Sequence, residues 1–289
     1  MTDSNFVFAA RRDRLGARLG NFISAWEFAQ KTGRTLILNW EDYADLQPGS
    51  FSFFDFFGNL DGMSEELGVI IDTGTRKEFF NKLEKHKVSS IENHLNQSID
   101  HFKTIDAAVL FNRTTQYKFS GEATKKSNFR AELFQRLPLN AKISSTLDRV
   151  FENEKLSDSI SVHVRMGDII DLLSNISEDE PESKKRSQVA SFASRFAPQQ
   201  AYMSAVEAFP SSTVFVFSDS DIARSAFKDR FGSRIVDIRQ DLDKLALSNA
   251  QVAFCEMQII MRTSEIICAR SAFSNLACHL SACKMHPVF

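Results

Sequence analysis

The sequence has few cysteines, and all four lie after residue 254. Cys255, Cys268, Cys278 and Cys283 have spacings that match no Cys-x-x-Cys metal pattern. The sequence therefore predicts buried thiols in a reducing compartment, with disulfides as the alternative.

The sequence also lacks a long apolar run and an excess of charge of either sign. No stretch is apolar over the ~18 residues that a membrane-spanning helix needs, and the first residues, MTDSN, do not resemble a secretory signal. We therefore expect a cytoplasmic protein without an integral membrane segment. Lys and Arg number 35 and Asp and Glu 37, for a formal charge of −2. A chain without a global positive field is not expected to bind nucleic acid, so any basic site must be local.

Strand and helix patterns alternate along the 289 residues. Residues 5–9 and 35–39 resemble parallel strands on either side of a helix that ends before Gly33, which is a βαβ unit. From residue 159 onward a strand pattern is followed by a helix pattern four times, as in a parallel, doubly wound sheet. We expect an α/β protein of two Rossmann-like domains, residues 1–139 and 140–289, that hold a ligand in the cleft between them.

A strand and loop in the middle of the chain, residues 159–170 (SISVHVRMGDII), carry the central functional signal. Apolar residues alternate with small or polar ones and stop at an Arg-x-Gly-Asp tetrapeptide, which predicts a strand that delivers a cation and a carboxylate to a tight loop. Ligands bind at this end of the strands in open α/β sheets. Arg165 offers an always-charged fork suited to phosphate, and Gly167 permits close approach of the backbone. A surface arginine beside a turn glycine is the alternative.

Two further predicted strand ends carry similar groups. Ser218 and Asp219 follow a predicted strand, and residues 271–275, with Ser271, Ser274 and Asn275, are predicted to be a loop that leads into a helix at residues 276–283. Hydroxyls and backbone N–H groups at a helix start can meet an anion, although plain helix caps are the alternative for each group alone. Together with Arg165 and Asp168, the groups recur at one edge of one predicted sheet. The preceding helix is predicted over residues 245–262.

A basic segment with two glycines, residues 11–21, precedes a predicted helix whose buried face begins at Phe22. Backbone N–H groups at the helix start, with Arg14 and Arg18 beside them, would hold an anion. In the alternative interpretation the glycines only shape the turn and the arginines are solvated.

Two other segments are distinctive in composition. Five phenylalanines between residues 51 and 57 are predicted to be core residues, with an exposed apolar surface as the alternative. Residues 172–188 are strongly charged and are predicted to form an exposed loop, with a lid that orders on ligand binding as the alternative.

Four motifs in this order resemble the fucosyltransferase superfamily that groups the α-1,2-, α-1,6- and protein O-fucosyltransferases. Residues 18–21 (RLGN), followed by a helix and residues 33–38 (GRTLIL), are similar to its N-terminal Gly-Asn loop. Residues 163–168 (HVRMGD) resemble its His-x-Arg signature, residues 214–219 (VFVFSD) its strand ending in Ser/Thr-Asp, and residues 256–280 its closing motif. The ordered set is more specific than any single motif.

The resemblance implies a GT-B fold, a GDP-fucose donor bound by the C-terminal half, a glycan acceptor, inversion at the anomeric carbon and no divalent metal. Arg165 would bind the β-phosphate, because without a metal a positioned cation must offset the charge that develops as GDP leaves. The other implied donor-site residues are Ser218, Asp219 (at guanine or ribose), Ser271, Ser274 and Asn275 (at the phosphates), and Gly20 and Asn21 (over the pyrophosphate). His163 is either a donor contact or a packed strand residue. Asp168 is the candidate general base, with loop bracing as the alternative.

One departure from the family pattern leaves alternatives open. Many relatives have a second arginine where this chain has Met166, so either one cation suffices or another residue, such as Arg14 or Arg18, supplies the second.

The leading hypothesis is a bacterial-type, GDP-fucose-dependent fucosyltransferase. The alternatives are a GT-B enzyme for another nucleotide sugar and an inactive nucleotide- or glycan-binding relative. A kinase is disfavoured, because the sequence has neither a P-loop nor an Asp-rich magnesium motif.

Overall fold

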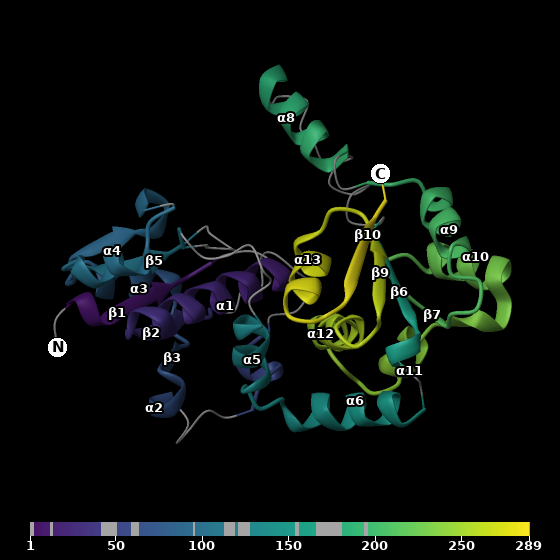
Figure 1. Cartoon of the computed structure of the whole chain (residues 1–289), viewed down its shortest axis with the longest axis horizontal. Helices are drawn as coiled ribbons and strands as arrows, with labels where there is room; N and C mark the ends of the chain where they lie inside the picture. Colours follow the sequence, from purple (N-terminus) through teal and green to yellow (C-terminus); the bar gives the residue numbers. More distant parts are fainter. Residues whose placement is uncertain are drawn as a thin grey trace. The chain divides into compact units, whose positions relative to one another are not determined.

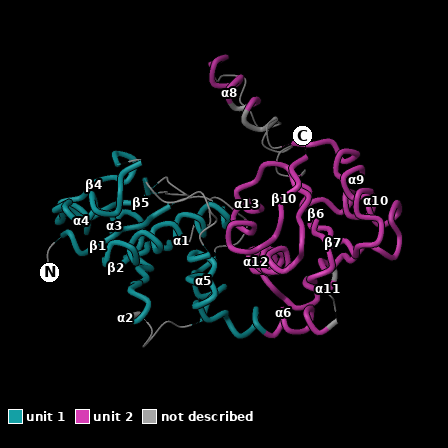
Figure 2. Tube along the Cα trace, viewed as in Figure 1, with its two compact units in different colours: residues 1–144 teal, residues 145–289 magenta. Residues whose placement is uncertain are grey.

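The computed structural model describes residues 3–11, 14–41, 51–58, 64–94, 96–112, 119–120, 128–153, 156–165, 181–193 and 196–288. The chain divides into two compact units, residues 1–144 and 145–289 (Figure 2). None of the described helices is long and apolar enough to cross a membrane.

Unit 1 is built on a five-stranded sheet in the order β3-β2-β1-β5-β4, in which every neighbouring pair is parallel (Figure 1). Its strands are β1 (Phe6–Ala9), β2 (Thr35–Asn39), β3 (Val69–Asp72), β4 (Val88–Ser90) and β5 (Ala108–Phe111). Its helices are α1 (Leu15–Thr32), α2 (Ser64–Leu67), α3 (Arg76–Leu83), α4 (Ile99–Thr104) and α5 (Phe129–Gln135), with 3-10 turns at Asp3–Asn5, Phe53–Asp55 and Ile91–His94.

Helix α1 is the central helix of unit 1. It packs on β1 and β2 and against α4 and α5, so every residue from Leu15 to Ala29 is buried. Gly33 ends the helix in the left-handed conformation (φ 69°), where its N–H reaches back to helix carbonyls and where a side chain would be strained. The strand, helix, glycine stop and strand predicted for residues 5–39 are therefore confirmed.

Unit 2 is built on a second five-stranded sheet in the order β10-β9-β6-β7-β8, also parallel at every pair. Its strands are β6 (Ile160–Val164), β7 (Val214–Ser218), β8 (Ile235–Val236), β9 (Glu265–Cys268) and β10 (Lys284–Pro287). Its helices are α8 (Glu182–Ala193), α9 (Gln199–Glu207), α10 (Asp221–Phe231), α11 (Arg239–Asp243), α12 (Asn249–Ile260) and α13 (Ala272–His279), with 3-10 turns at Leu156–Asp158 and Gly232–Arg234. Helix α6 (Ala141–Asn153) contains the division between the units.

Helices cover both faces of the second sheet, with α9 and α10 on one side and α12 and α13 on the other (Figure 1). Strands β6 and β7 are almost entirely buried, because both faces are covered. One core cluster joins Val162 and Val216 of the strands to Tyr202 of α9 and Phe227 of α10. The predicted parallel α/β architecture is confirmed for both units.

Two predicted helices have different bounds in the structure. The helix predicted over residues 245–262 is shorter: Ala246 has a positive φ of 50°, and Ser248 caps α12 in a capping box with Gln251. The helix predicted over residues 276–283 begins at Ala272, because Ser271 is its N-cap. Residues 182–188, predicted as loop, belong to helix α8.

The predictions for phenylalanine and cysteine concern burial. Phe51, Phe53, Phe56 and Phe57 are at most 4% exposed, so the core interpretation is confirmed, and only Phe54 is partly exposed, at 38%. All four cysteines are buried free thiols. The thiol interpretation is therefore confirmed over disulfides.

Candidate functional site

The second sheet has a topological switch point between β6 and β9. From β6 the chain first adds β7 and β8 on one side and later β9 and β10 on the other. Loops that leave neighbouring strands in opposite directions open a crevice at the carboxyl ends of those strands, where open α/β sheets bind ligands. The strands β9, β6 and β7 are neighbours, so the strand ends that carry Ser271, Arg165 and Ser218 are adjacent.

At the tip of β6 the side chain of His163 contacts α13. His163 Nδ1 lies 2.6 Å from Ser274 Oγ, and its ring lies 5.2 Å from the ring of Phe273. Arg165 follows the last residue of β6 and is partly exposed. The strand therefore places Arg165 and His163 at the carboxyl end of the sheet, where open α/β sheets bind ligands.

The start of α13 lies at the tip of β9. The Ser271 hydroxyl accepts a hydrogen bond from the Phe273 N–H at 3.2 Å and caps the helix. Ser274 and Asn275 therefore lie in the first turn of the helix and not in a loop, which corrects the prediction. The Ser274 side chain is fully buried against His163. A ligand at this turn would meet the backbone N–H groups of the helix start and the partly exposed Asn275.

At the tip of β7, Ser218 is buried and shapes the turn. Its hydroxyl accepts from the Ser220 N–H at 3.1 Å, and its carbonyl accepts from Arg224 Nη1 at 2.6 Å. Arg224 Nε also donates to Asp237 Oδ2 at 3.2 Å, which joins the ends of β7 and β8. Asp219 is exposed beside this braced turn, so it presents its carboxylate at the sheet edge.

A buried carboxylate continues this network. Glu256 of α12 faces Arg239, whose Nη1 lies 3.5 Å from its Oε1, and the Arg239 N–H donates to Asp237 Oδ1 at 3.0 Å. Burial raises the pKa of Glu256 to about 7, although Arg239 partly offsets this. The sequence interpretation did not identify Glu256 as a site residue. The available signal was a lone acid inside the apolar helix sequence NAQVAFCEMQII.

The sequence matches no protein-family model and no curated protein. Solved structures do match the chain. The fucosyltransferase NodZ from Bradyrhizobium is 20% identical, with a TM-score of 0.59 over 94% of this chain and 91% of that one. The chain has the fold of this fucosyltransferase.

Two further structures are similar. A NodZ α-1,6-fucosyltransferase soaked with GDP-fucose is 18% identical, with a TM-score of 0.57 over 96% of this chain and 92% of that one. POFUT1 in complex with GDP-fucose is 15% identical, with a TM-score of 0.50 over 99% of both chains. The resemblance to the fucosyltransferase superfamily is thereby confirmed at the level of the fold.

In this fucosyltransferase fold, Tyr202 lies under the switch point. Helix α9 packs on β6 and β9, and the Tyr202 side chain is fully buried. Burial raises the pKa of its phenol to about 12, while the neighbouring backbone amides of Ala269 and Arg165 act in the opposite direction. Tyr202 was not identified from the sequence, because its spacing with the buried Met203 and Val206 is that of an ordinary core residue.

The predicted N-terminal loop is part of a helix. Gly20 and Asn21 lie inside α1 and are buried, and Asn21 Nδ2 lies 3.4 Å from the carbonyl oxygen of Phe111 at the end of β5. Arg18 is only 3% exposed. Its guanidinium lies over the ring of Trp40 at 4.2 Å, and its Nη2 donates to the Glu41 carbonyl at 2.7 Å. Arg18 is therefore engaged in packing contacts and is not solvated, which favours the alternatives of a single cation or of a second cation from another residue, such as Arg14.

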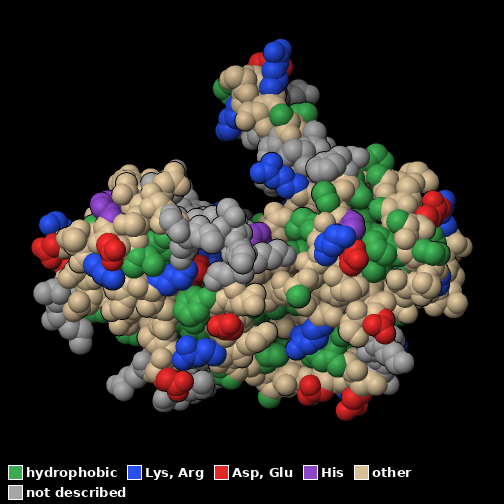
Figure 3. Space-filling model, in the orientation of Figure 1, with side chains coloured by type: hydrophobic (Ala, Val, Ile, Leu, Met, Phe, Trp, Pro, Cys, Tyr) green, Lys and Arg blue, Asp and Glu red, His purple; other side chains and the backbone are tan. Residues whose placement is uncertain are grey.

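Three residues of the His-x-Arg signature, Met166, Gly167 and Asp168, lie outside the described residues. Among the residues that the structure describes, no three His, Cys, Asp or Glu side chains are placed to hold a metal ion. Acidic and basic side chains are interspersed over the face shown in Figure 3, without a large patch of one sign.

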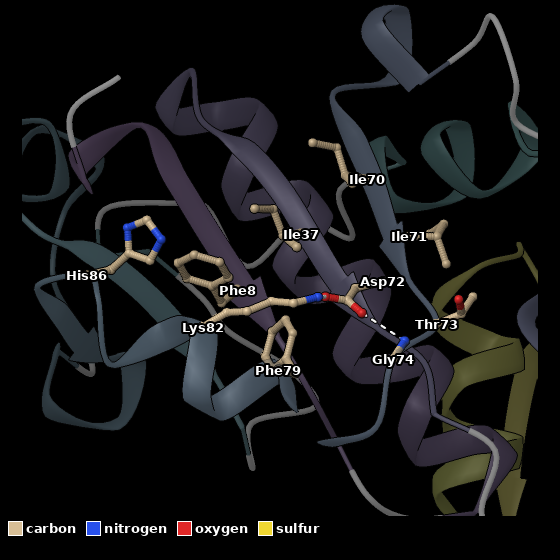
Figure 4. A pocket seen from close by; sticks show the side chains of 10 residues that line it. All are labelled: Phe8, Ile37, Ile70, Ile71, Asp72, Thr73, Gly74, Phe79, Lys82 and His86. Atoms are coloured by element: carbon tan, nitrogen blue, oxygen red, sulfur yellow. Dashed lines mark hydrogen bonds and ion pairs between the residues drawn. The ribbon is translucent and has the colours of Figure 1, made fainter. Parts of the chain in front are cut away.

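A cavity of about 570 Å³ lies in unit 1, and none of the predicted site residues lines it (Figure 4). Phe8, Ile37, Ile70 and Phe79 form its apolar lining. At its rim Lys82 Nζ pairs with Asp72 Oδ2 at 2.7 Å. Its size and apolar lining alone do not identify the ligand site, because the clustered strand-end chemistry lies in unit 2.

Proposed function

We propose that this chain is a GT-B glycosyltransferase that transfers fucose from GDP-fucose to a glycan acceptor, with inversion and without a divalent metal. One observation carries the proposal: three polar strand ends meet at the β6/β9 switch point, in a fold similar to that of a fucosyltransferase soaked with GDP-fucose. The buried free thiols fit a reducing, cytoplasmic setting.

In the proposed site Arg165 and the start of α13 hold the pyrophosphate. The guanidinium carries a fixed positive charge, and the first turn of α13 presents backbone N–H groups and the positive end of the helix dipole. Both stabilise negative charge on the β-phosphate as the bond to the sugar breaks. Because Arg18 is engaged with Trp40 and Glu41, we assign no role in catalysis to it.

Asp219 and its braced turn are assigned to the nucleoside. A carboxylate accepts hydrogen bonds from ribose hydroxyls or from guanine N–H groups. Arg224 holds the turn through the Ser218 carbonyl and Asp237, so the carboxylate is presented from a rigid element. Glu256 extends this network, because it pairs with Arg239, whose backbone N–H donates to Asp237.

The reaction forms one bond and breaks one. An acceptor hydroxyl oxygen attacks the anomeric carbon of fucose, and the bond from that carbon to the β-phosphate oxygen breaks on the opposite face, which inverts the configuration. The bonding electrons leave with GDP, whose charge Arg165 offsets. The hydroxyl proton passes to a general base, and Asp168 is proposed for this role from its place three residues after Arg165.

The test is calorimetric binding of GDP, GDP-fucose, GDP-mannose and UDP-sugars in EDTA. We expect selective GDP and GDP-fucose binding that Arg165→Ala weakens by about 100-fold. Arg230→Ala is the control, because Arg230 is partly exposed and pairs with Glu207 on α9. No binding of any guanine nucleotide would contradict the proposal. UDP-sugar binding would favour another donor, and GDP-fucose binding without transfer to any glycan would favour an inactive relative.

A further inference from the structure

The buried Ser274 hydroxyl contacts two other polar side chains at the switch point. His163 Nδ1 lies 2.6 Å from Ser274 Oγ. The Cys268 thiol is the second neighbour, and strand register places Cys268 opposite His163. Ser274 is fully buried and Cys268 is 1% exposed, so water does not compete for these contacts. His163, Ser274 and Cys268 therefore form one hydrogen-bonding cluster, which we call the β6/β9 cluster.

The serine has a single proton to donate, and the chemistry of its neighbours decides where that proton goes. Burial raises the pKa of Cys268 to about 11, and the Ser274 hydroxyl offsets part of this effect, so the thiol keeps its own proton near neutral pH. A thiol sulfur is a weak acceptor, whereas an unprotonated imidazole nitrogen is a strong one. The 2.6 Å separation from Nδ1 is also shorter than an N–H···O bond usually is and fits an O–H donor.

The orientation of the His163 ring determines what this bond achieves. His163 is the only residue of β6 that is not fully buried, and its Nδ1 edge is the edge that faces buried Ser274. The edge that carries Nε2 is therefore directed away from Ser274. Phe273 lies against the ring with an interplanar angle of 38° and helps to hold it in place.

We propose that Ser274 is a positioning residue: it donates to His163 Nδ1, holds the imidazole in the Nε2–H tautomer, and so makes His163 an N–H donor at the donor-substrate crevice. The ligand group that such a donor recognises is an acceptor oxygen of the nucleotide. Ser274 then acts through His163 and does not itself touch the nucleotide. The recognition step rests on the proposed function, whereas the tautomer is a property of the free protein.

The first test is ¹⁵N NMR of the six histidines in the free protein at pH 8, with His163→Gln to assign the signal. We expect a proton on Nε2 and none on Nδ1, and a mixture of tautomers in Ser274→Ala. Ser281→Ala is the matched control. Ser281 lies just after the same helix, and its hydroxyl donates to the Ala277 carbonyl at 2.8 Å and not to a histidine. A proton on Nδ1 in the parent protein, or an unchanged tautomer in Ser274→Ala, would overturn the proposal.

The second test is GDP affinity by calorimetry. Ser274→Ala is expected to weaken GDP binding by up to about tenfold, the cost of one hydrogen bond. His163→Gln, which can place an amide N–H near the Nε2 position, should bind GDP more tightly than His163→Asn. In the His163→Asn background Ser274→Ala should have no further effect, and additive losses would show that Ser274 contacts GDP itself and overturn the proposal. A parent protein that binds no GDP would instead contradict the proposed function, and the NMR result would still decide on the tautomer.

Discussion

Glu256 makes the stability of the protein depend on pH. The folded protein holds the carboxyl proton up to about pH 7, whereas the unfolded chain releases it at an ordinary acid pKa. Between these values the folded state binds the extra proton, so the contribution to stability is present at low pH and is lost as the pH rises toward 7. We expect the free energy of unfolding to fall by about 1 kcal/mol per pH unit relative to Glu256→Gln between pH 5 and 7.

Urea denaturation of both proteins at several pH values measures this difference. Glu207→Gln is the control, because that carboxylate is about half exposed on α9. Parallel stability profiles for the parent and Glu256→Gln would show that Glu256 ionises normally in the folded protein.

Arg34 is a buried cation whose guanidinium donates to backbone carbonyl groups. Its Nη1 donates to the Ala107 carbonyl at 2.8 Å, and its Nη2 donates to Phe102 at 2.7 Å and Ile105 at 3.3 Å, at the end of α4 and ahead of β5. Arg34→Ala leaves two buried carbonyls and one partly buried carbonyl without this donor. We expect a loss of about 3 kcal/mol in the free energy of unfolding, measured with urea.

Lys103→Ala is the comparison for Arg34. Lys103 pairs with Asp100 on the surface of α4 at 2.9 Å, and its removal should cost about 0.5 kcal/mol or less. Equal losses in the two variants would show that the Arg34 contacts do not stabilise unit 1.

The sequence placed some of the proposed site residues at the ends of elements and left other contacts unseen, for a physical reason. Arg165 and Ser271 lie at strand and helix ends, which local patterns mark. Tyr202 and Glu256 lie close to residues distant in the chain, Ala269 and Arg239, and such neighbours exist only once the strands are ordered. The packing of Arg18 could not be predicted, because its aromatic partners, Trp40 and Phe51, are not its neighbours in the sequence.

At the scale of the element, the start of α13 both stabilises the fold and forms part of the proposed ligand site. Ser271 caps the helix, so Ser271→Ala should lower the free energy of unfolding by about 1 kcal/mol. It should also weaken GDP binding, because the first turn of α13 is the proposed anion site. Calorimetry and urea denaturation measure the two effects.

Ser248→Ala is a matched comparison for the α13 cap. The Ser248 hydroxyl also caps its helix, α12, by accepting a hydrogen bond from a backbone N–H, that of Gln251, at 3.2 Å. Ser248→Ala should lower the free energy of unfolding by a similar amount and leave the affinity for GDP unchanged. If both variants bind GDP equally, the start of α13 is not part of the nucleotide site.

Element types were easier to predict than their ends. Strands β6, β7 and β9 are short apolar runs, so their existence was evident. Strand β10 has the sequence KMHP and is largely exposed at the sheet edge, so it carries no such signal. The break before α12 depends on one backbone angle at Ala246, which no apolar pattern reveals.

At the scale of the whole chain, both units place their first strand in the middle of a parallel sheet. In unit 1 the last strand, β5, lies beside β1, whereas in unit 2 the last strand, β10, forms the edge and β9 lies beside β6. The alternation of strands and helices predicted two such sheets. It did not predict their strand orders, which depend on the side to which each crossover returns.

Because each unit has its own sheet and core, local perturbations should remain within one unit. Hydrogen exchange with mass spectrometry measures this. GDP at 100 times its dissociation constant should stabilise its binding unit by about 2.7 kcal/mol and slow exchange in peptides from β6, β9 and α13. Arg34→Ala should speed exchange in unit 1, most of all in α4 and β5, and not in β6 or β9. If Arg34→Ala speeds exchange equally in β6 and β9, the two units unfold as one cooperative body, and the stability effects expected for single residues belong to the whole chain.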